Sequence, residues 1–132
     1  MEMWIRRIVG VVLVLGGSAQ LSRAEEKPAV VAGALHRIEQ NALAVKHDTS
    51  IYQWERVDDE VDRIAAAEHK VHKSLTQDPA KRDLADILGR DVHELRSADF
   101  ARDVKRSVKA SEKLTALIPK LQNAVGGPAT GH

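Results

Sequence analysis

The chain has 132 residues, among them 20 Lys and Arg, 19 Asp and Glu, and no cysteine. This length favours one domain with a single hydrophobic core over a multidomain enzyme. Without cysteine the chain has no disulfide, thiolate zinc site, cysteine nucleophile or covalent c-type haem. Three basic residues and one acid precede residue 25, which leaves 17 basic against 18 acidic residues and three aromatics. Nucleic-acid binding needs excess positive charge and stacking surfaces, so we expect no nucleic-acid partner.

Residues 1–24 are predicted to be a secretory signal peptide. Arg6 and Arg7 form a positive start, an apolar run follows, and the small residues Ser22 and Ala24 precede a cleavage site before Glu25. The apolar run is shorter than the ~20 residues that cross a bilayer. Export to the periplasm or the medium, without a stable membrane anchor, is therefore favoured over the alternative of an uncleaved anchor.

The first helix is predicted over residues 28–47, where the apolar positions share one helical face: Val31, Leu35, Ile38, Ala42 and Val45. Ser50 and Gln53 have the spacing of a capping box, which predicts a second helix over residues 51–75. Glu68 interrupts the apolar face of this second helix with a carboxylate. That face consists of Trp54, Val57, Val61, Ile64, Val71 and Leu75.

Asp78 as N-cap and Pro79 in the first turn predict the start of a third helix. Its apolar face consists of Leu84, Ile87, Leu88, Val92 and Leu95. The next apolar face begins at Phe100, about 140° out of phase at the ~100° per residue of a helix. This shift predicts a turn with Ser97 or Asp99 as N-cap of a fourth helix. The face of that helix consists of Phe100, Val104, Val108, Leu114, Leu117, Ile118 and Leu121.

Pro119 is expected to bend or end the fourth helix because it lacks an amide donor. Residues 126–132 are expected to form a disordered tail. Residues 25–125 then contain four amphipathic helices joined by short turns, which predict an all-α, up-down-up-down four-helix bundle. The alternative is a three-helix arrangement in which residues 79–118 form one long helix.

Short turns make neighbouring helices antiparallel, which brings several small residues to one level of the predicted bundle: Ala32, Ala66, Gly89 and Ser107. Glu68 lies just beyond that level, and Ser107, Ser111 and Asp91 are predicted to face inward. The simpler interpretation is close helix approach, with Glu68 bonded to a serine or paired with a basic residue. The alternative is a small polar pocket for a ligand or an ion, because a buried carboxylate needs a partner or water.

His69 and His72 are three residues apart on one side of a helix and lie beside Glu68. Imidazole and carboxylate groups suit zinc, copper or nickel, so these three residues are the candidate metal ligands. Two histidines do not complete a site, and no H-E-x-x-H motif is present. The simpler interpretation is that they face solvent near a helix end, where the dipole favours them. We expect no other cofactor.

No catalytic constellation is found, because Ser107 and Ser111 lack a histidine at neighbouring helical positions and no G-x-S-x-G motif occurs. We therefore expect a protein that is not an enzyme.

Charge is distributed unevenly between two of the predicted helices. The second helix is acidic through Glu55, Asp58, Asp59, Glu60 and Asp62. The fourth carries a basic ridge of Arg102, Lys105, Arg106, Lys109 and Lys113. The simple explanation of both charged faces is that they are exposed to solvent. The alternative is that the basic ridge contacts an acidic partner, an anionic membrane surface or the acidic patch of another copy.

Two hypotheses of function follow from these patterns. The first is an exported, non-enzymatic interaction module that acts through protein contacts or self-association. The second is a periplasmic transition-metal-binding protein that uses His69, His72 and Glu68.

Overall fold

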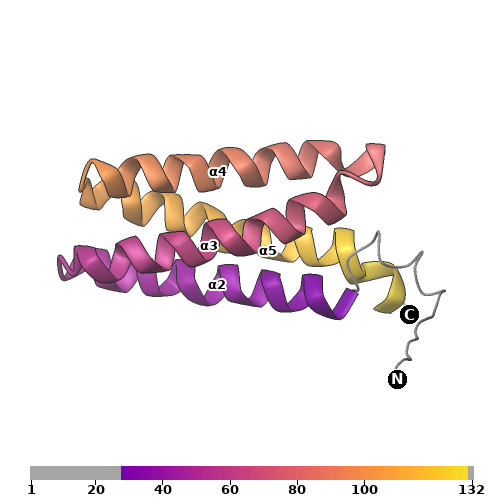
Figure 1. Cartoon of the computed structure of the whole chain (residues 1–132), viewed down its shortest axis with the longest axis horizontal. Coiled ribbons are helices and arrows are strands. Elements are labelled where there is room, and N and C mark those ends of the chain that lie inside the picture. Colours follow the sequence, from indigo (N-terminus) through magenta and orange to yellow (C-terminus); the bar gives the residue numbers. More distant parts are fainter. Residues whose placement is uncertain (1–27, 131–132) are drawn as a thin grey trace, which may run out of the picture.

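The computed structural model describes the backbone of residues 28–130 and the side chains of residues 28–125. The elements in chain order are α2 (Pro28–Ser50), α3 (Trp54–Leu75), the 3₁₀ turn η2 (Pro79–Lys81), α4 (Arg82–Phe100) and α5 (Val104–Thr130). Figure 1 shows the four α-helices side by side, and the described part of the chain contains no strand. The predicted signal peptide lies outside the described residues.

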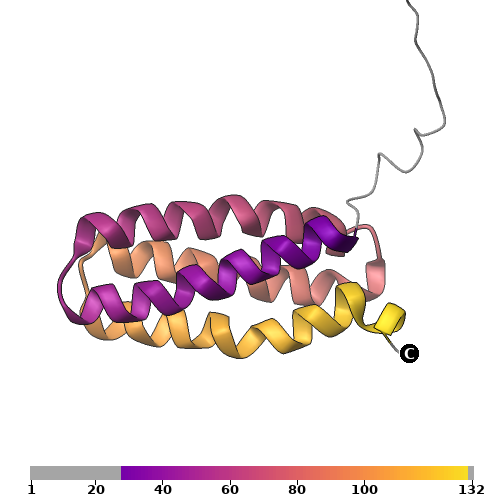
Figure 2. The same ribbon diagram turned by 90° about the horizontal axis from the view of Figure 1, so that it is seen from below.

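The helices form an up-down-up-down four-helix bundle, as the sequence predicted (Figures 1 and 2). α2 packs on α3 and α5, and α4 packs on the same two helices, whereas α3 and α5 barely touch. α3 and α5 therefore occupy diagonal corners. The α2–α3 and α4–α5 turns lie together at one end of the bundle, which we call the turn end. The three-helix alternative is wrong because the chain reverses between α4 and α5.

The core is built mostly from the predicted apolar faces, but Phe100, predicted to begin the face of the last helix, ends α4 and is 91% exposed. Ile38, Ile64, Leu88 and Leu114, one from each helix, are fully buried, and burial of such a side chain contributes about 1.5–3 kcal/mol. Ser107 and Ser111 also face inward, as expected. None of the described helices is long and apolar enough to cross a membrane.

The two turns at the turn end share one geometry. In the first, the amide of Gln53 donates to the carbonyl of Asp48 at 2.9 Å, and in the second the amide of Asp103 donates to that of Ala98 at 3.0 Å. These bonds are the 6→1 bonds of a Schellman motif, which usually places glycine at the left-handed position. Here that position is taken by Tyr52 (φ 61°) and by Arg102 (φ 52°).

This geometry corrects the predicted start of the second helix. Ser50 is the last residue of α2 and donates its hydroxyl to the carbonyl of His47 at 2.6 Å. α3 begins only at Trp54, and Gln53 makes no side-chain cap. The predicted capping box is therefore wrong.

The predicted N-cap of the last helix is also wrong. α4 continues through Ser97 and Asp99 to Phe100. The cap is Asp103, whose Oδ1 accepts from the amide of Arg106 at 3.0 Å. Without a glycine at the left-handed position, the sequence carries no strong signal for the turn.

The predicted start of the third helix is found as the start of the 3₁₀ turn η2, since the side chain of Asp78 accepts from the amide of Ala80 at 3.0 Å and Pro79 follows the cap. The α-helix α4 itself begins three residues later, at Arg82. α5 does not end at Pro119, and Figure 2 shows it bowed along its length. The helix α5 extends to Thr130, and disorder of the predicted tail, residues 126–132, stays a prediction. Residues 131–132 lie outside the described residues.

Burial repeats along the chain with a period of fifty residues. The α2–α3 hairpin and the α4–α5 hairpin bury equivalent positions although few of their residues are identical. The matching buried pairs include Ile38 and Leu88, Val45 and Leu95, Val57 and Ser107, Ile64 and Leu114, and Val71 and Leu121. The two hairpins are therefore related by an approximate twofold axis along the bundle, which takes α3 onto the diagonal helix α5.

Candidate interaction surface

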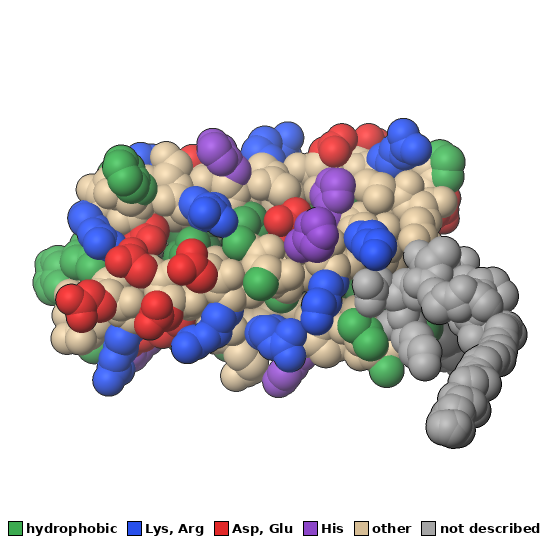
Figure 3. All heavy atoms as spheres, in the orientation of Figure 1, with side chains coloured by type: hydrophobic (Ala, Val, Ile, Leu, Met, Phe, Trp, Pro, Cys, Tyr) green, Lys and Arg blue, Asp and Glu red, His purple; other side chains and the backbone are tan. Residues whose placement is uncertain are grey.

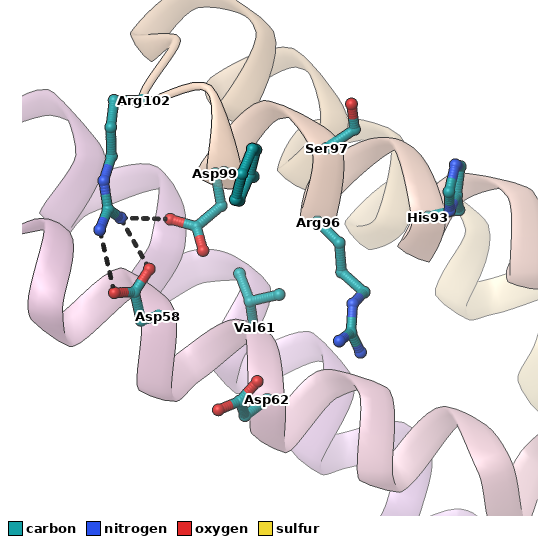
Figure 4. Close-up of a pocket in the computed structure, with 9 residues that line it drawn as sticks. Asp58, Val61, Asp62, His93, Arg96, Ser97, Asp99 and Arg102 are labelled. Carbon is teal, nitrogen blue, oxygen red and sulfur yellow. Dashed lines mark hydrogen bonds and ion pairs between the residues drawn. The ribbon is translucent and has the colours of Figure 1, made fainter.

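An open groove of about 610 Å³ lies between α3 and α4 near the turn end (Figure 4). Its lining is mostly charged and comes from α3, from α4 and from the turn that follows: Asp58, Val61, Asp62, His93, Arg96, Ser97, Asp99, Phe100 and Arg102. Phe100 is 91% exposed. The groove thus combines an exposed aromatic ring with charges of both signs.

Arg102 joins the turn to both walls of the groove. Its guanidinium donates to the two carboxylate oxygens of Asp58 at 2.7 and 3.2 Å and to Asp99 Oδ1 at 3.1 Å (Figure 4). It also lies 5.4 Å from the centroid of the Trp54 ring, a cation–π contact. Arg102 was predicted as part of a basic ridge on the last helix; it lies instead in the α4–α5 turn and holds α3 against α4.

Asp58 and Asp99 form a carboxyl pair beneath this guanidinium. The hydrogen bond from Arg102 lowers the pKa of Asp58. Burial, followed by the hydrogen bond with Asp58, raises the pKa of Asp99 to about 6. Asp99 therefore takes up a proton more readily than an ordinary aspartate, which lets the two carboxyls share one.

A second carboxyl pair, Asp48 and Glu60, joins α2 to α3 at the same end of the bundle. Burial raises the pKa of Glu60 to about 8, and the hydrogen bond with Asp48 adds to this shift. That bond lowers the pKa of Asp48, and His47 Nδ1, 3.0 Å from Asp48 Oδ1, acts in the same direction. At neutral pH Glu60 is therefore the protonated partner of an ionised Asp48.

The burial of Glu60 differs from the prediction for the second helix. We placed Glu60 on a solvated acidic face and Glu68 on the apolar face, but Glu60 is 8% exposed and Glu68 is half-buried. The spacing contains a signal for this, because Glu60 follows Val57 by three residues and precedes Ile64 by four. Residues with that spacing share one helical face.

The expected layer of small residues does not form as predicted. Glu68 lies beside Gly89, since a Cβ built on Gly89 would be 3.9 Å from Glu68 Oε2. Ala32 and Ala66, however, are exposed. The buried positions of α3 follow the face of Ile64, and Ala66 points away from it. Asp91 is half-buried rather than inward.

The candidate metal ligands are close in the chain but do not gather into a site. His69 is exposed and His72 half-buried. Within residues 28–125, no group of three or more His, Asp or Glu side chains converges as a metal site requires. Metal binding by His69, His72 and Glu68 stays a prediction from the sequence.

The rest of the predicted basic ridge lies on α5. Arg106 donates to Glu94 Oε2 and to Ser97 Oγ, each at 3.1 Å, and so ties α5 to α4. Lys105, Lys109 and Lys113 are exposed. These three lysines are the part of the ridge that is free to meet another molecule.

Three buried polar atoms have no hydrogen-bond partner in the described structure: Thr49 Oγ1, Glu60 Oε1 and Ser107 Oγ. Ser111 instead donates to the carbonyl of Val108 at 2.8 Å. Thr49, Ser107 and Ser111 are buried in the core of the bundle, and none of them lines the groove.

No protein-family model, curated protein sequence or solved structure matches the chain. The function is therefore inferred from the geometry and charge of the groove and its surroundings.

Proposed function

We propose that this protein is an exported, non-enzymatic interaction module that binds a protein partner through the α3–α4 groove. The observation that carries the proposal is Phe100, 91% exposed at a groove lined by charged side chains. Large exposed aromatics beside polar groups are typical of residues that anchor a protein partner.

The groove supplies polar anchors beside this ring. His93 and Arg96 line it and have no hydrogen-bond or ion-pair partner among the described side chains, and Figure 4 shows Arg96 reaching from α4 over the groove. Arg102, in contrast, is held by Asp58 and Asp99. The walls are thus fixed while Arg96 is available to an acidic group of the partner.

Capture by immobilised protein from the exported fraction of the source cells tests the proposal. The groove variants are Phe100→Ser and Arg96→Glu, and the matched control is Leu43→Ser, which changes an exposed apolar residue of α2. Wild type and control are expected to retain the same partner, and each groove variant to retain at least about tenfold less of it, since central anchors dominate binding energy. Equal retention by the groove variants and the control would show that the groove is not the binding surface.

A further inference from the structure

Two stripes of opposite charge run along the outer faces of α3 and α5. We define the acidic stripe as Glu55, Asp59 and Asp62 on α3 and the basic stripe as Lys105, Lys109 and Lys113 on α5. All six side chains are exposed, and within the described residues none forms an ion pair or hydrogen bond. Figure 3 shows acidic side chains gathered over α3 toward the turn end.

The stripes occupy equivalent positions in the two hairpins. Glu55 and Lys105, and likewise Asp59 and Lys109, are fifty residues apart, which is the period of the burial pattern. Because the approximate twofold axis takes α3 onto α5, the two stripes lie at one level of the bundle. Because α3 and α5 are diagonal, the stripes face opposite ways.

This arrangement fits a second copy of the chain. α3 and α5 run in the same direction (Figure 1), so a copy displaced sideways, without rotation about its axis, brings its α5 against α3 of the first. Glu55 then faces Lys105 and Asp59 faces Lys109, with Asp62 near Lys113. At ~1.5 Å rise per residue the acidic stripe spans about 10 Å and the basic stripe about 12 Å.

We propose that copies of this protein associate side by side and in parallel, with the basic stripe of one on the acidic stripe of the next. The inference rests on the proposed function and names a second copy as one partner of this face. A twofold dimer through either stripe would oppose like charges, which is unfavourable. A sideways displacement instead leaves a free basic stripe on the molecule at one end and a free acidic stripe on the molecule at the other. Further copies can add at both ends, so the contact generates open chains.

The contact also involves the groove, because Asp62 belongs both to the acidic stripe and to the groove lining. An α5 that packs on the acidic stripe therefore lies beside the groove that Phe100 also lines. Exposed ion pairs are individually weak and are screened by salt. The association is consequently strongest at low ionic strength.

Sedimentation velocity on the full-length mature protein tests the inference, with two charge-reversal variants. The acid-reversed variant carries Glu55→Lys and Asp59→Lys, and the base-reversed variant carries Lys105→Glu and Lys109→Glu. Wild type is expected to form concentration-dependent species larger than a monomer at about 20 mM salt and to dissociate at about 500 mM, where screening is short-ranged. Each variant alone is expected to be a monomer, with the dissociation constant raised at least about tenfold.

An equimolar mixture of the two variants tests whether opposite charges on the two stripes drive the association. The acid-reversed variant is basic on both faces and the base-reversed variant is acidic on both, so the mixture is expected to regain association. The control Arg82→Glu with Arg90→Glu, which reverses two exposed charges on α4, is expected to behave as wild type. A monomeric wild type at low salt, a mixture that stays monomeric, or a dimer that does not grow with concentration would overturn the proposal.

The two proposals fail separately. Loss of self-association leaves capture through the groove intact if an external partner is bound by Phe100 and Arg96. Equal partner retention by the groove variants leaves the sedimentation result unchanged.

Discussion

Glu60 is the residue at which burial and charge conflict most strongly. Its carboxyl group is almost fully buried, and one of its oxygens has no partner among the described residues. Burial and the neighbouring Asp48 raise its pKa from 4.5 to about 8, while Arg63 and Arg56 oppose the shift. Between those pKa values the folded protein holds a proton that the unfolded chain has released. The free energy of unfolding therefore falls as the pH rises through this window.

Glu60→Gln removes this titration and keeps a hydrogen-bond donor toward Asp48. At pH 9 the variant is expected to be about 1–3 kcal/mol more stable than wild type, because it avoids a buried second charge. Urea unfolding from pH 4 to pH 9 measures the effect. Glu55→Gln, an exposed carboxylate on the same helix, controls for the loss of one negative charge. A wild-type free energy of unfolding that stays constant from pH 5 to pH 9 would contradict the assignment.

At the scale of elements, the two turns decide where helices begin and end. Both place a residue with a side chain in the left-handed region, Tyr52 in one turn and Arg102 in the other. That conformation is unfavourable for L-residues other than glycine. At Arg102 the bonds to Asp58 and Asp99 offset the strain. Tyr52 is 69% exposed, so its side chain offers little compensation.

Glycine substitutions separate strain from side-chain contact. Tyr52→Gly is expected to stabilise the protein by about 1 kcal/mol, since it relieves the strain and the exposed ring has little contact to lose. Arg102→Gly and Arg102→Ala both lose the contacts to α3 and α4, but only glycine also relieves the strain. The alanine variant is therefore expected to be the less stable of the two. Thermal unfolding of the three variants provides the measurement. An alanine variant as stable as the glycine variant would show that position 102 is not strained.

At the scale of the whole molecule, the bundle closes as a ring of four helix pairs. α5 returns to pack on α2, so the last helix and the first are direct neighbours, and the start of α2 lies at the same end as the last turns of α5. The α3–α4 connection lies at that end too. The stability of the bundle is therefore not expected to depend on the α2–α3 hairpin preceding the α4–α5 hairpin in the chain.

Circular permutation tests whether the bundle depends on the order of its hairpins in the chain. A chain that begins at Asp78, runs through α4 and α5, and enters α2 through a short Gly-Ser linker is expected to fold cooperatively. Its stability should lie within about 2 kcal/mol of the unpermuted chain, because linker length costs little and neighbouring ends tolerate permutation. A chain opened instead before Asp103 separates Arg102 from its turn and is expected to be less stable. Circular dichroism with urea unfolding compares them, and a molten or domain-swapped product of the first permutation would contradict the ring description.

The sequence by itself determined the fold class and the main buried faces. Apolar spacing of three and four residues reports directly on a helical face, and Asp78 with Pro79 marks a helix start by local chemistry alone. It also singled out Ser107 and Ser111 as inward and identified the charged residues of both stripes. These features depend on residues within one or two helical turns of each other.

Only the tertiary structure decided which acids are buried and what they meet. Glu60 and Glu68 both lie within the apolar spacing of α3, and the rotation of that helix against α2 and α4 buries the first and leaves the second half-exposed. The bond from Arg102 to Asp58 joins residues 44 positions apart, and the diagonal placement of α3 and α5 sets the two charged stripes on opposite faces. Such relations arise from packing between distant segments; local spacing marks Glu60 and Glu68 as candidates for burial but does not decide between them.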